Sequence, residues 1–276
     1  MKAFVIPRYG PPEGLELREF PNFTADEGEL LVRVHAASVN ALDWRRSLGS
    51  PWLVRLSEGL RRPRRPRLGV DFAGRVEALG KGATGFQPGD EVFGLTYGAF
   101  GEYASVATDE IARMPPGVSF EDSATLGIAA ITALQALRDH GQVRPGHSVL
   151  IHGAGGGVGT FAVQLAKWMG AQVTATSRPE TFEVLRTLGA DRVLDYRKED
   201  FGALPEKFDL ILDLHPERSV SQYKQALKPG GIALTVGFAR LTRLLRVAVR
   251  GKVKPRSGKK QVGFIIAKPT AKDLAL

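Results

Sequence analysis

A glycine-rich stretch, HGAGGGVGTFAVQLAKWMG, holds the residues with the clearest chemical meaning in this chain. A tight turn whose backbone touches a pyrophosphate needs residues without a Cβ, and the free N–H groups of a following helix attract an anion. We therefore expect the phosphates of a dinucleotide to bind at Gly153, Gly156, Gly157, Val158 and Gly159. The alternative is a loop whose glycines serve only flexibility or a close contact between helix and strand.

The next predicted strand, 172–177, ends without an acidic residue at Thr176-Ser177-Arg178. Enzymes that prefer NAD usually place Asp or Glu here to bind the ribose hydroxyls, whereas a cation suits the 2′-phosphate of NADP. The Arg178 guanidinium offers paired donors to a phosphate. Ser177 and Arg178 therefore favour NADPH. Ser177-Arg178-Pro179-Glu180 also fits a capping box, which leaves a purely structural role for Ser177 open.

Strands and helices alternate around these residues. Apolar runs predict strands at 148–152, 172–177, 192–195, 208–214 and 231–236, and helices at 123–140, 158–170, 180–189 and 217–227. Such alternation predicts βαβ units and an α/β fold with a doubly wound parallel sheet of Rossmann type.

The first third of the chain is rich in β-strand signals instead. Residues 30–40 alternate apolar and polar side chains, and residues 68–94 contain short apolar runs broken by glycines and by Pro88-Gly89-Asp90. This pattern is typical of a small barrel with tight turns. We therefore expect a barrel domain over 1–119 and a dinucleotide-binding domain over 120–276.

Composition excludes several classes of site. The chain has 276 residues, a net charge of +9 and no cysteine, so disulfides and thiolate metal sites are ruled out. Basic residues gather at 55–67 and 240–260, which could form a surface for nucleic acid, anionic lipid or a phosphorylated ligand. Neither block carries interleaved aromatic residues, so we interpret both as solvated loops. No apolar run has the length of a signal peptide or a membrane span, and we expect a cytoplasmic protein.

Taken together, these segments resemble the medium-chain dehydrogenase/reductase superfamily, specifically its zinc-independent quinone oxidoreductase-like branch. The resemblance covers nearly the whole chain in order. It is carried by MKAFVIPRYGPPEGLELRE, GVDFAGRVEALG, FQPGDEVFG, GAFGEYASV, GIAAITALQAL, GAGGGVG and LGADRVLDYRKEDF. It implies an N-terminal GroES-like β-barrel followed by a Rossmann-type domain.

The resemblance also implies roles for individual residues. Asn40, in the Asn-x-x-Asp element that ends at Asp43, would orient the substrate or the nicotinamide. Thr132 would approach the nicotinamide, and Tyr196 would lie near the 2′-phosphate. Gly237-Phe238, after the fifth strand, would border the nicotinamide.

Two positions depart from the patterns of the superfamily. Its zinc-using members carry a cysteine near position 40 and a histidine–glutamate pair where this chain has Gly69-Val70-Asp71, so we expect no metal. Related quinone reductases often carry a tyrosine where this chain has Arg45, a permanent cation that forms hydrogen bonds but cannot donate a proton. We interpret Asp43 as a buried acid that holds its loop.

The last departure concerns the C-terminal segment. The chain ends at Leu276, inside a helix expected to begin at PTAKDLAL and before the segment with which the superfamily completes its barrel. Two hypotheses follow. One is an NADPH-dependent oxidoreductase that transfers hydride to a quinone, an enone or another activated carbonyl. The other is an NADPH-binding or interaction protein of the same fold with an impaired site. Members of the superfamily are commonly homodimers.

Overall fold

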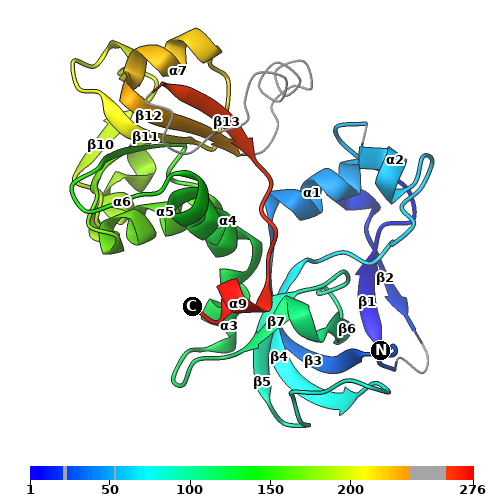
Figure 1. Ribbon diagram of the computed structural model, residues 1–276. Helices are drawn as coiled ribbons and strands as arrows, with labels where there is room; N and C mark the ends of the chain where they lie inside the picture. Colours follow the sequence, from blue (N-terminus) through cyan, green and yellow to red (C-terminus); the bar gives the residue numbers. More distant parts are fainter. Residues whose placement is uncertain (21–23, 53, 237–258) are drawn as a thin grey trace. The chain divides into compact units, whose positions relative to one another are not determined.

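The computed structural model describes residues 1–276 except 21–23, 53 and 237–258 (Figure 1). Its contacts divide the chain into two units, Met1–Ile131 with Lys268–Leu276, and Thr132–Ala267. The predicted boundary at 119/120 differs from this division. Residues 120–131 pack on the first unit, because Phe120 and Ile131 join an apolar cluster with its strands, and Leu274 joins the same cluster from the C-terminal end.

The first unit is built on antiparallel strands. Five form a sheet in the order β6-β3-β4-β5-β7, and β1 and β2 form a separate ribbon. The strands are β1 (Lys2–Val5), β2 (Glu16–Glu19), β3 (Glu29–Ser38), β4 (Asp71–Leu79), β5 (Glu91–Leu95), β6 (Tyr103–Ala107) and β7 (Ile111–Arg113). The register of β3 and β4 runs from the pair Leu30–Leu79 to the pair Ser38–Asp71. The end of β3 therefore meets the beginning of β4.

Short helices complete the first unit. They are η1 (Pro12–Gly14), α1 (Ala41–Leu48), α2 (Val54–Glu58), η2 (Thr108–Glu110), α3 (Phe120–Ala124), the π-helical turn η3 (Leu126–Ala130) and α9 (Ala271–Leu274). Helix α1 was not predicted. It begins directly after β3 and ends at Gly49, whose φ of +57° is a left-handed conformation that glycine adopts without strain. Asn40 therefore stands at the junction of a strand and a helix.

The second unit contains six parallel strands in the order β10-β9-β8-β11-β12-β13. They are β8 (Ser148–His152), β9 (Gln172–Ser177), β10 (Arg192–Asp195), β11 (Phe208–Asp213), β12 (Leu227–Val236) and β13 (Gln261–Ile265). This order is that of a dinucleotide-binding sheet, in which the strand order reverses between β8 and β11. The predicted fold class, a GroES-like N-terminal domain with a Rossmann-type domain, is confirmed.

Helices cover both faces of this sheet (Figure 1). They are α4 (Ile131–Gln135), the π-helical turn η4 (Ala136–His140), α5 (Gly157–Trp168), η5 (Pro179–Thr181), α6 (Phe182–Thr187), η6 (Phe201–Ala203) and α7 (Val220–Ala226). Successive residues of a strand point to opposite faces. Val149 and Ile151 accordingly pack with α5, whereas Leu150 packs with Tyr223 of α7. The apolar runs that predicted the strands are those of a sheet buried on both sides.

A buried carboxylate interrupts the helical stretch predicted at 123–140. Asp71, at the start of β4, is fully buried, and its two oxygens accept the backbone N–H of Ile128 at 3.0 and 3.1 Å. A Cβ at Gly127 would lie 2.5 Å from this carboxyl group, and Gly127 has the non-helical angles φ −58° and ψ −108°. The stretch is therefore not one regular helix: it runs through α3, the turn η3 that binds Asp71, α4 and η4.

Burial raises the pKa of Asp71 from 3.8 to about 7. The hydrogen bond from Ile128 acts in the opposite direction, as do those from Asn40 and Ser38, whereas the charge of Asp43 raises the pKa further. Between the pKa of the unfolded chain and this value, the folded protein binds more protons than the unfolded one. Its stability therefore falls as the pH rises through that window.

Asp71→Asn should remove this pH dependence. From pH 4 to 7, wild type should lose on the order of 4 kcal/mol more of its unfolding free energy than the variant, because each pKa unit corresponds to about 1.4 kcal/mol. Denaturant titrations over this range measure the difference. Asp139→Asn, at an exposed carboxylate, is the control and should behave as wild type. Parallel curves for wild type and Asp71→Asn would contradict the assignment of a raised pKa.

Candidate functional site

The glycine loop connects β8 to α5. Gly153 has a φ of +81°, a conformation that glycine adopts readily. The backbone N–H groups of Gly153 and Ala154 both donate to the carbonyl of Thr176, at 3.1 and 3.0 Å. These two bonds fasten the loop to the end of β9, so that the loop lies at the carboxyl edge of the sheet beside the point where the strand order reverses.

The glycines of this loop serve different purposes. A Cβ at Gly159 would lie 2.4 Å from the carbonyl oxygen of Ala154, and one at Gly155 would lie 2.5 Å from Ser177 Oγ. The protein itself needs glycine at these two positions. A Cβ at Gly156 would meet its nearest neighbour at 3.7 Å, and Gly156 and Gly157 are exposed at the start of α5. The backbone N–H of Gly156 donates to the carbonyl of Gly153 at 3.3 Å, whereas the N–H groups of Gly157 and Val158, in the first turn of α5, have no acceptor within the helix and can bind an anion.

Ser177 does not form the capping box that its sequence allowed. The turn η5 begins at Pro179 with Arg178 at the N-cap and no side-chain capping bond. The Ser177 side chain is buried instead, with its Oγ 2.6 Å from the hydroxyl of Thr181 and against Gly155. The reason is packing: the hydroxyl occupies the space that the missing Cβ of Gly155 leaves.

Two arginines surround Tyr196 at the ends of β9 and β10. Asp195 pairs with Ser177, so the next residues, Tyr196 and Arg178, lie at one edge of the sheet. Hydrogen bonding from the side chains of Arg197 and Arg178 lowers the pKa of Tyr196, whose ring is 43% exposed. The guanidinium of Arg197 lies 5.9 Å from the centre of that ring. This corner of the sheet concentrates two cations and a phenol on the open surface.

Asn40 is the centre of a second polar group, in the barrel unit. Its Nδ2 donates to Asp71 Oδ2 at 3.0 Å and to Ser38 Oγ at 3.2 Å, and the Ser38 hydroxyl donates to Asp71 Oδ2 at 3.3 Å. The backbone N–H of Asn40 donates to Asp43 Oδ2 at 2.8 Å. Asp43 is buried and caps α1, which agrees with its interpretation as an acid that holds the loop.

The other predicted site residues are distributed over both units. Arg45 is half-buried in α1, in the barrel unit with Asn40. Thr132 is buried in α4, and it belongs to the same unit as the glycine loop and Tyr196. Gly237 and Phe238 lie outside the described residues.

Sequence reasoning missed three residues that these groups contain. Arg197 follows Tyr196 directly in VLDYR. A tyrosine and an arginine together after a predicted strand could have identified Arg197 as a candidate phosphate ligand. Asp71 is an acid within the apolar run LGVDFAG, and an acid in such a run indicates a buried carboxylate. Ser38 gave no signal, because its partner Asp71 comes from a different strand.

The arginines of the first basic block contact groups within the barrel unit. Arg55 donates to the carbonyls of Leu48 and Gly49, each at 3.1 Å, and its guanidinium lies 4.5 Å from the centre of the Tyr9 ring. These contacts favour a structural role for Arg55. The part of the second block over 240–258 lies outside the described residues.

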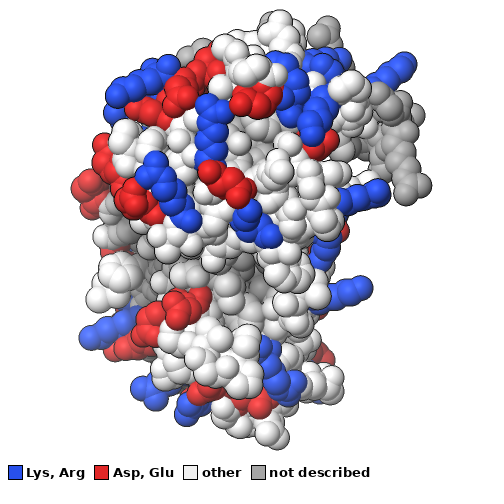
Figure 2. Space-filling view, turned by 90° about the vertical axis from the view of Figure 1, so that its left-hand side faces the viewer, with Lys and Arg blue, Asp and Glu red and all other residues white. Residues whose placement is uncertain are grey.

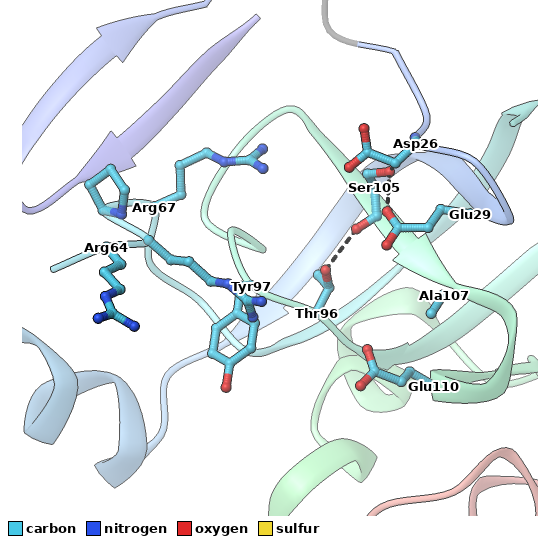
Figure 3. A pocket seen from close by; sticks show the side chains of 11 residues that line it. Asp26, Glu29, Arg64, Arg67, Thr96, Tyr97, Ser105, Ala107 and Glu110 are labelled. Atoms are coloured by element: carbon cyan, nitrogen blue, oxygen red, sulfur yellow. Dashed lines mark hydrogen bonds between the residues drawn. The ribbon is translucent and has the colours of Figure 1, made fainter. Parts of the chain in front are cut away.

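Three further arginines of this block line a cavity of about 530 Å³, opposite three acids (Figure 3). Arg64 and Arg67 lie across the cavity from Asp26, Glu29 and Glu110 in Figure 3, and Arg65 also lines it. The face drawn in Figure 2 likewise intersperses cations with acids. Mixed charge of this kind is poorly suited to a polyanion, which a continuous basic surface would bind better.

The described residues contain neither a membrane-spanning helix nor a cluster of metal-ligating side chains. None of the helices there is both long and apolar enough to cross a membrane. Over the same residues, no three histidine, aspartate or glutamate side chains gather in a group that could hold a metal ion.

Comparison with known families assigns both units. Residues 26–116 match the alcohol dehydrogenase GroES-like domain, and residues 157–257 match the family described as zinc-binding dehydrogenase. The first match covers the barrel strands from the turn before β3 onward. The second begins at the start of α5, within the glycine loop.

Individual relatives extend over most of the chain. It is 34% identical to the 2-methylene-furan-3-one reductase of Solanum lycopersicum, over 83% of this chain and 59% of that relative. It is 33% identical to a chloroplastic quinone oxidoreductase of Triphysaria versicolor, over 86% of this chain and 74% of the relative. The chain thus spans less than two thirds of the Solanum protein and about three quarters of the Triphysaria protein.

A solved structure agrees with these matches. The quinone oxidoreductase from Coxiella burnetii superposes with a TM-score of 0.86 and 31% identity, over 100% of this chain and 85% of that one. The strand order, the glycine loop and the relatives lead to one conclusion. This chain belongs to the medium-chain dehydrogenase/reductase superfamily of oxidoreductases, in its quinone oxidoreductase-like branch.

Proposed function

We propose that this protein is a zinc-independent, NADPH-dependent oxidoreductase that transfers hydride to a quinone, an enone or another activated carbonyl. The observation that carries the proposal is the pairing of Arg178 and Arg197 around Tyr196, beside the glycine loop. The proposal includes a cytoplasmic location and the homodimer that is common in the superfamily.

The residues present fit NADPH well. The N–H groups of Gly157 and Val158, in the first turn of α5, would hold the pyrophosphate. Arg178 and Arg197 would hold the 2′-phosphate, because guanidinium groups form paired, charge-assisted hydrogen bonds with phosphate oxygens. Asp195, the acid at this edge, accepts the backbone N–H of Arg197 at 3.0 Å and follows β10 rather than β9. It is therefore not at the position from which an acid usually binds the ribose hydroxyls.

NADPH supplies a hydride, and the acceptor must offer an electrophilic carbon. Asn40 would orient the acceptor or the nicotinamide through its amide, and Arg45, in the last turn of α1, would contribute positive charge. Arg45 cannot release a proton, so water or another group would protonate the reduced product. Zinc independence rests on the residues at the zinc-ligand positions, where Asn40 replaces the cysteine and Val70-Asp71 replaces the histidine–glutamate pair.

Activated acceptors suit a site without a Lewis acid. Reduction of a quinone or an enone gives a hydroquinone or an enolate, in which conjugation already stabilises the growing negative charge. The Solanum relative is named for a 2-methylene-3-one, a carbon–carbon double bond conjugated to a carbonyl, and the Triphysaria and Coxiella proteins are named for quinones. These names support the substrate class for this chain.

Turnover with a panel of acceptors tests the reaction. NADPH absorbance should fall with phenanthrenequinone and with small enones, and it should fall far more slowly with saturated ketones, which lack conjugation. Added zinc or a chelator should leave the rate unchanged. Saturable NADPH binding without oxidation by any acceptor would favour the NADPH-binding protein with an impaired site. Absence of NADPH binding would contradict both hypotheses.

Replacing the arginines tests the cofactor preference. Arg178→Ala and Arg197→Ala should each weaken NADPH binding about 10- to 100-fold, since each removes a charge-assisted interaction of about 1.5–3 kcal/mol. NADH has no 2′-phosphate, so its affinity should change little. Fluorescence titration of both cofactors measures this, with Arg186→Ala on α6 as an exposed control. Equal losses for NADPH and NADH would contradict a 2′-phosphate site.

Two glycine substitutions separate the structural and the binding roles of the loop. Gly159→Ala should cost about 1–3 kcal/mol of stability, because its methyl group would overlap the carbonyl of Ala154. Gly156→Ala should keep its stability. It should weaken the binding of NADPH and of NADH by a similar factor, because its methyl group would stand beside the N–H groups that bind the phosphates. Thermal unfolding and cofactor titration read the two effects separately. Wild-type affinity in Gly156→Ala would exclude the loop as the phosphate site.

A further inference from the structure

The Asn40 amide has a fixed direction within the barrel unit. Its nitrogen points to two oxygen atoms, Asp71 Oδ2 and Ser38 Oγ. An ionised carboxylate only accepts hydrogen bonds, so it selects the NH2 group of the amide over the oxygen. The oxygen is therefore the amide atom that a ligand would meet.

The surroundings of Asp71 make this selection dependent on its charge. The backbone N–H of Ile128 binds both carboxylate oxygens from η3, and the Ser38 hydroxyl approaches from β3. Leu95 is its pairing partner on β5. Asp43, on α1, is the charged group that raises the Asp71 pKa. Burial raises the pKa of Asp43 itself, and Arg46 on the same helix acts in the opposite direction. A neutral Asp71 would carry a proton toward Ser38 and Asn40, because Ile128 already donates to both of its oxygens.

We propose that Asp71 is a positioning residue whose charge decides whether Asn40 offers an acceptor or a donor to its ligand. With Asp71 ionised, the Asn40 oxygen accepts from a donor such as the carboxamide N–H of nicotinamide or the O–H of a hydroquinone. With Asp71 neutral, the carboxyl group no longer holds the Asn40 NH2 group, and the amide can turn this group toward a carbonyl oxygen of the ligand. The identity of the ligand rests on the proposed function, whereas the coupling between the two side chains does not.

The pKa of Asp71, about 7, places this change near neutral pH. Asp71→Asn imitates the neutral state at every pH. The new amide must keep its oxygen toward the N–H of Ile128, so its own NH2 group faces Asn40. Two NH2 groups cannot bind each other, and the Asn40 amide must reverse.

The sequence makes a direct test simple, because it contains only two asparagines, Asn22 and Asn40. Asparagine labelled with ¹⁵N at the side chain gives two NH2 signals, and Asn22→Gln identifies the signal of Asn40. In the full chain without cofactor, this signal should shift with a single midpoint near pH 7. Asp71→Asn adds a third labelled amide, so Asn40→Gln in the same background identifies the Asn40 signal there. That signal should remain constant with pH and should resemble the wild-type signal at low pH.

Two further variants should move the midpoint in opposite directions. Ser38→Ala removes a hydrogen bond that stabilises the charged carboxylate, so the midpoint should rise by roughly 0.5–1 pH unit. Asp43→Asn removes a like charge, so the midpoint should fall by a similar amount. These variants keep the test decisive if Asp71→Asn does not fold.

A flat Asn40 signal in wild type would overturn the proposal, as would an unchanged titration in Asp71→Asn. Shifts of the same sign in Ser38→Ala and Asp43→Asn would also overturn it. The measurement needs neither NADPH nor an acceptor, so its failure leaves the proposed reaction standing. Conversely, an inactive protein whose Asn40 signal titrates as expected would contradict the proposed function and not the coupling.

Discussion

The close contact between Gly159 and the carbonyl of Ala154 brings the start of α5 against the end of β8, and the proposed cofactor site is arranged around it. The hydrogen bonds from Gly153 and Ala154 to Thr176 then fix the loop to β9. Because β9 and β10 are parallel neighbours, the residues that follow them meet at the same edge. A single steric constraint thus places an anion-binding helix terminus beside the corner that contains Arg178 and Tyr196.

Buried polar groups organise the barrel unit in a comparable way. Asp71 joins β4 to the start of η3 and holds Asn40 at the junction of β3 and α1. A buried carboxylate of raised pKa costs stability at neutral pH, and a purely structural residue at this position could be neutral. Its hydrogen bonds to Asn40 and Ser38 give a reason for the charge, since an ionised carboxylate only accepts hydrogen bonds and so holds the NH2 group of the amide.

Much of the fold could be predicted from the sequence, because its signals are local. Apolar runs identified the buried strands β8, β9 and β11, and glycines between a strand and a helix identified the dinucleotide loop. The site was less predictable, because it depends on contacts between distant segments. The pairing of β9 with β10 brings Arg197 near Arg178, and the pairing of β3 with β4 brings Ser38 to Asp71. The capping box that the sequence also allowed at Ser177 does not form, because the Ser177 side chain packs against Gly155 and bonds to Thr181 instead.

Hydride transfer from NADPH is the central claim, and isotope transfer tests it most directly. NADPH carrying deuterium at the reactive C4 position of the nicotinamide would be mixed with an enone and the full chain, and the reduced product examined by mass spectrometry. The account predicts one deuterium per product molecule, bound to carbon at the β-position of the former enone. Product without deuterium, or no product while NADPH remains bound, would contradict it.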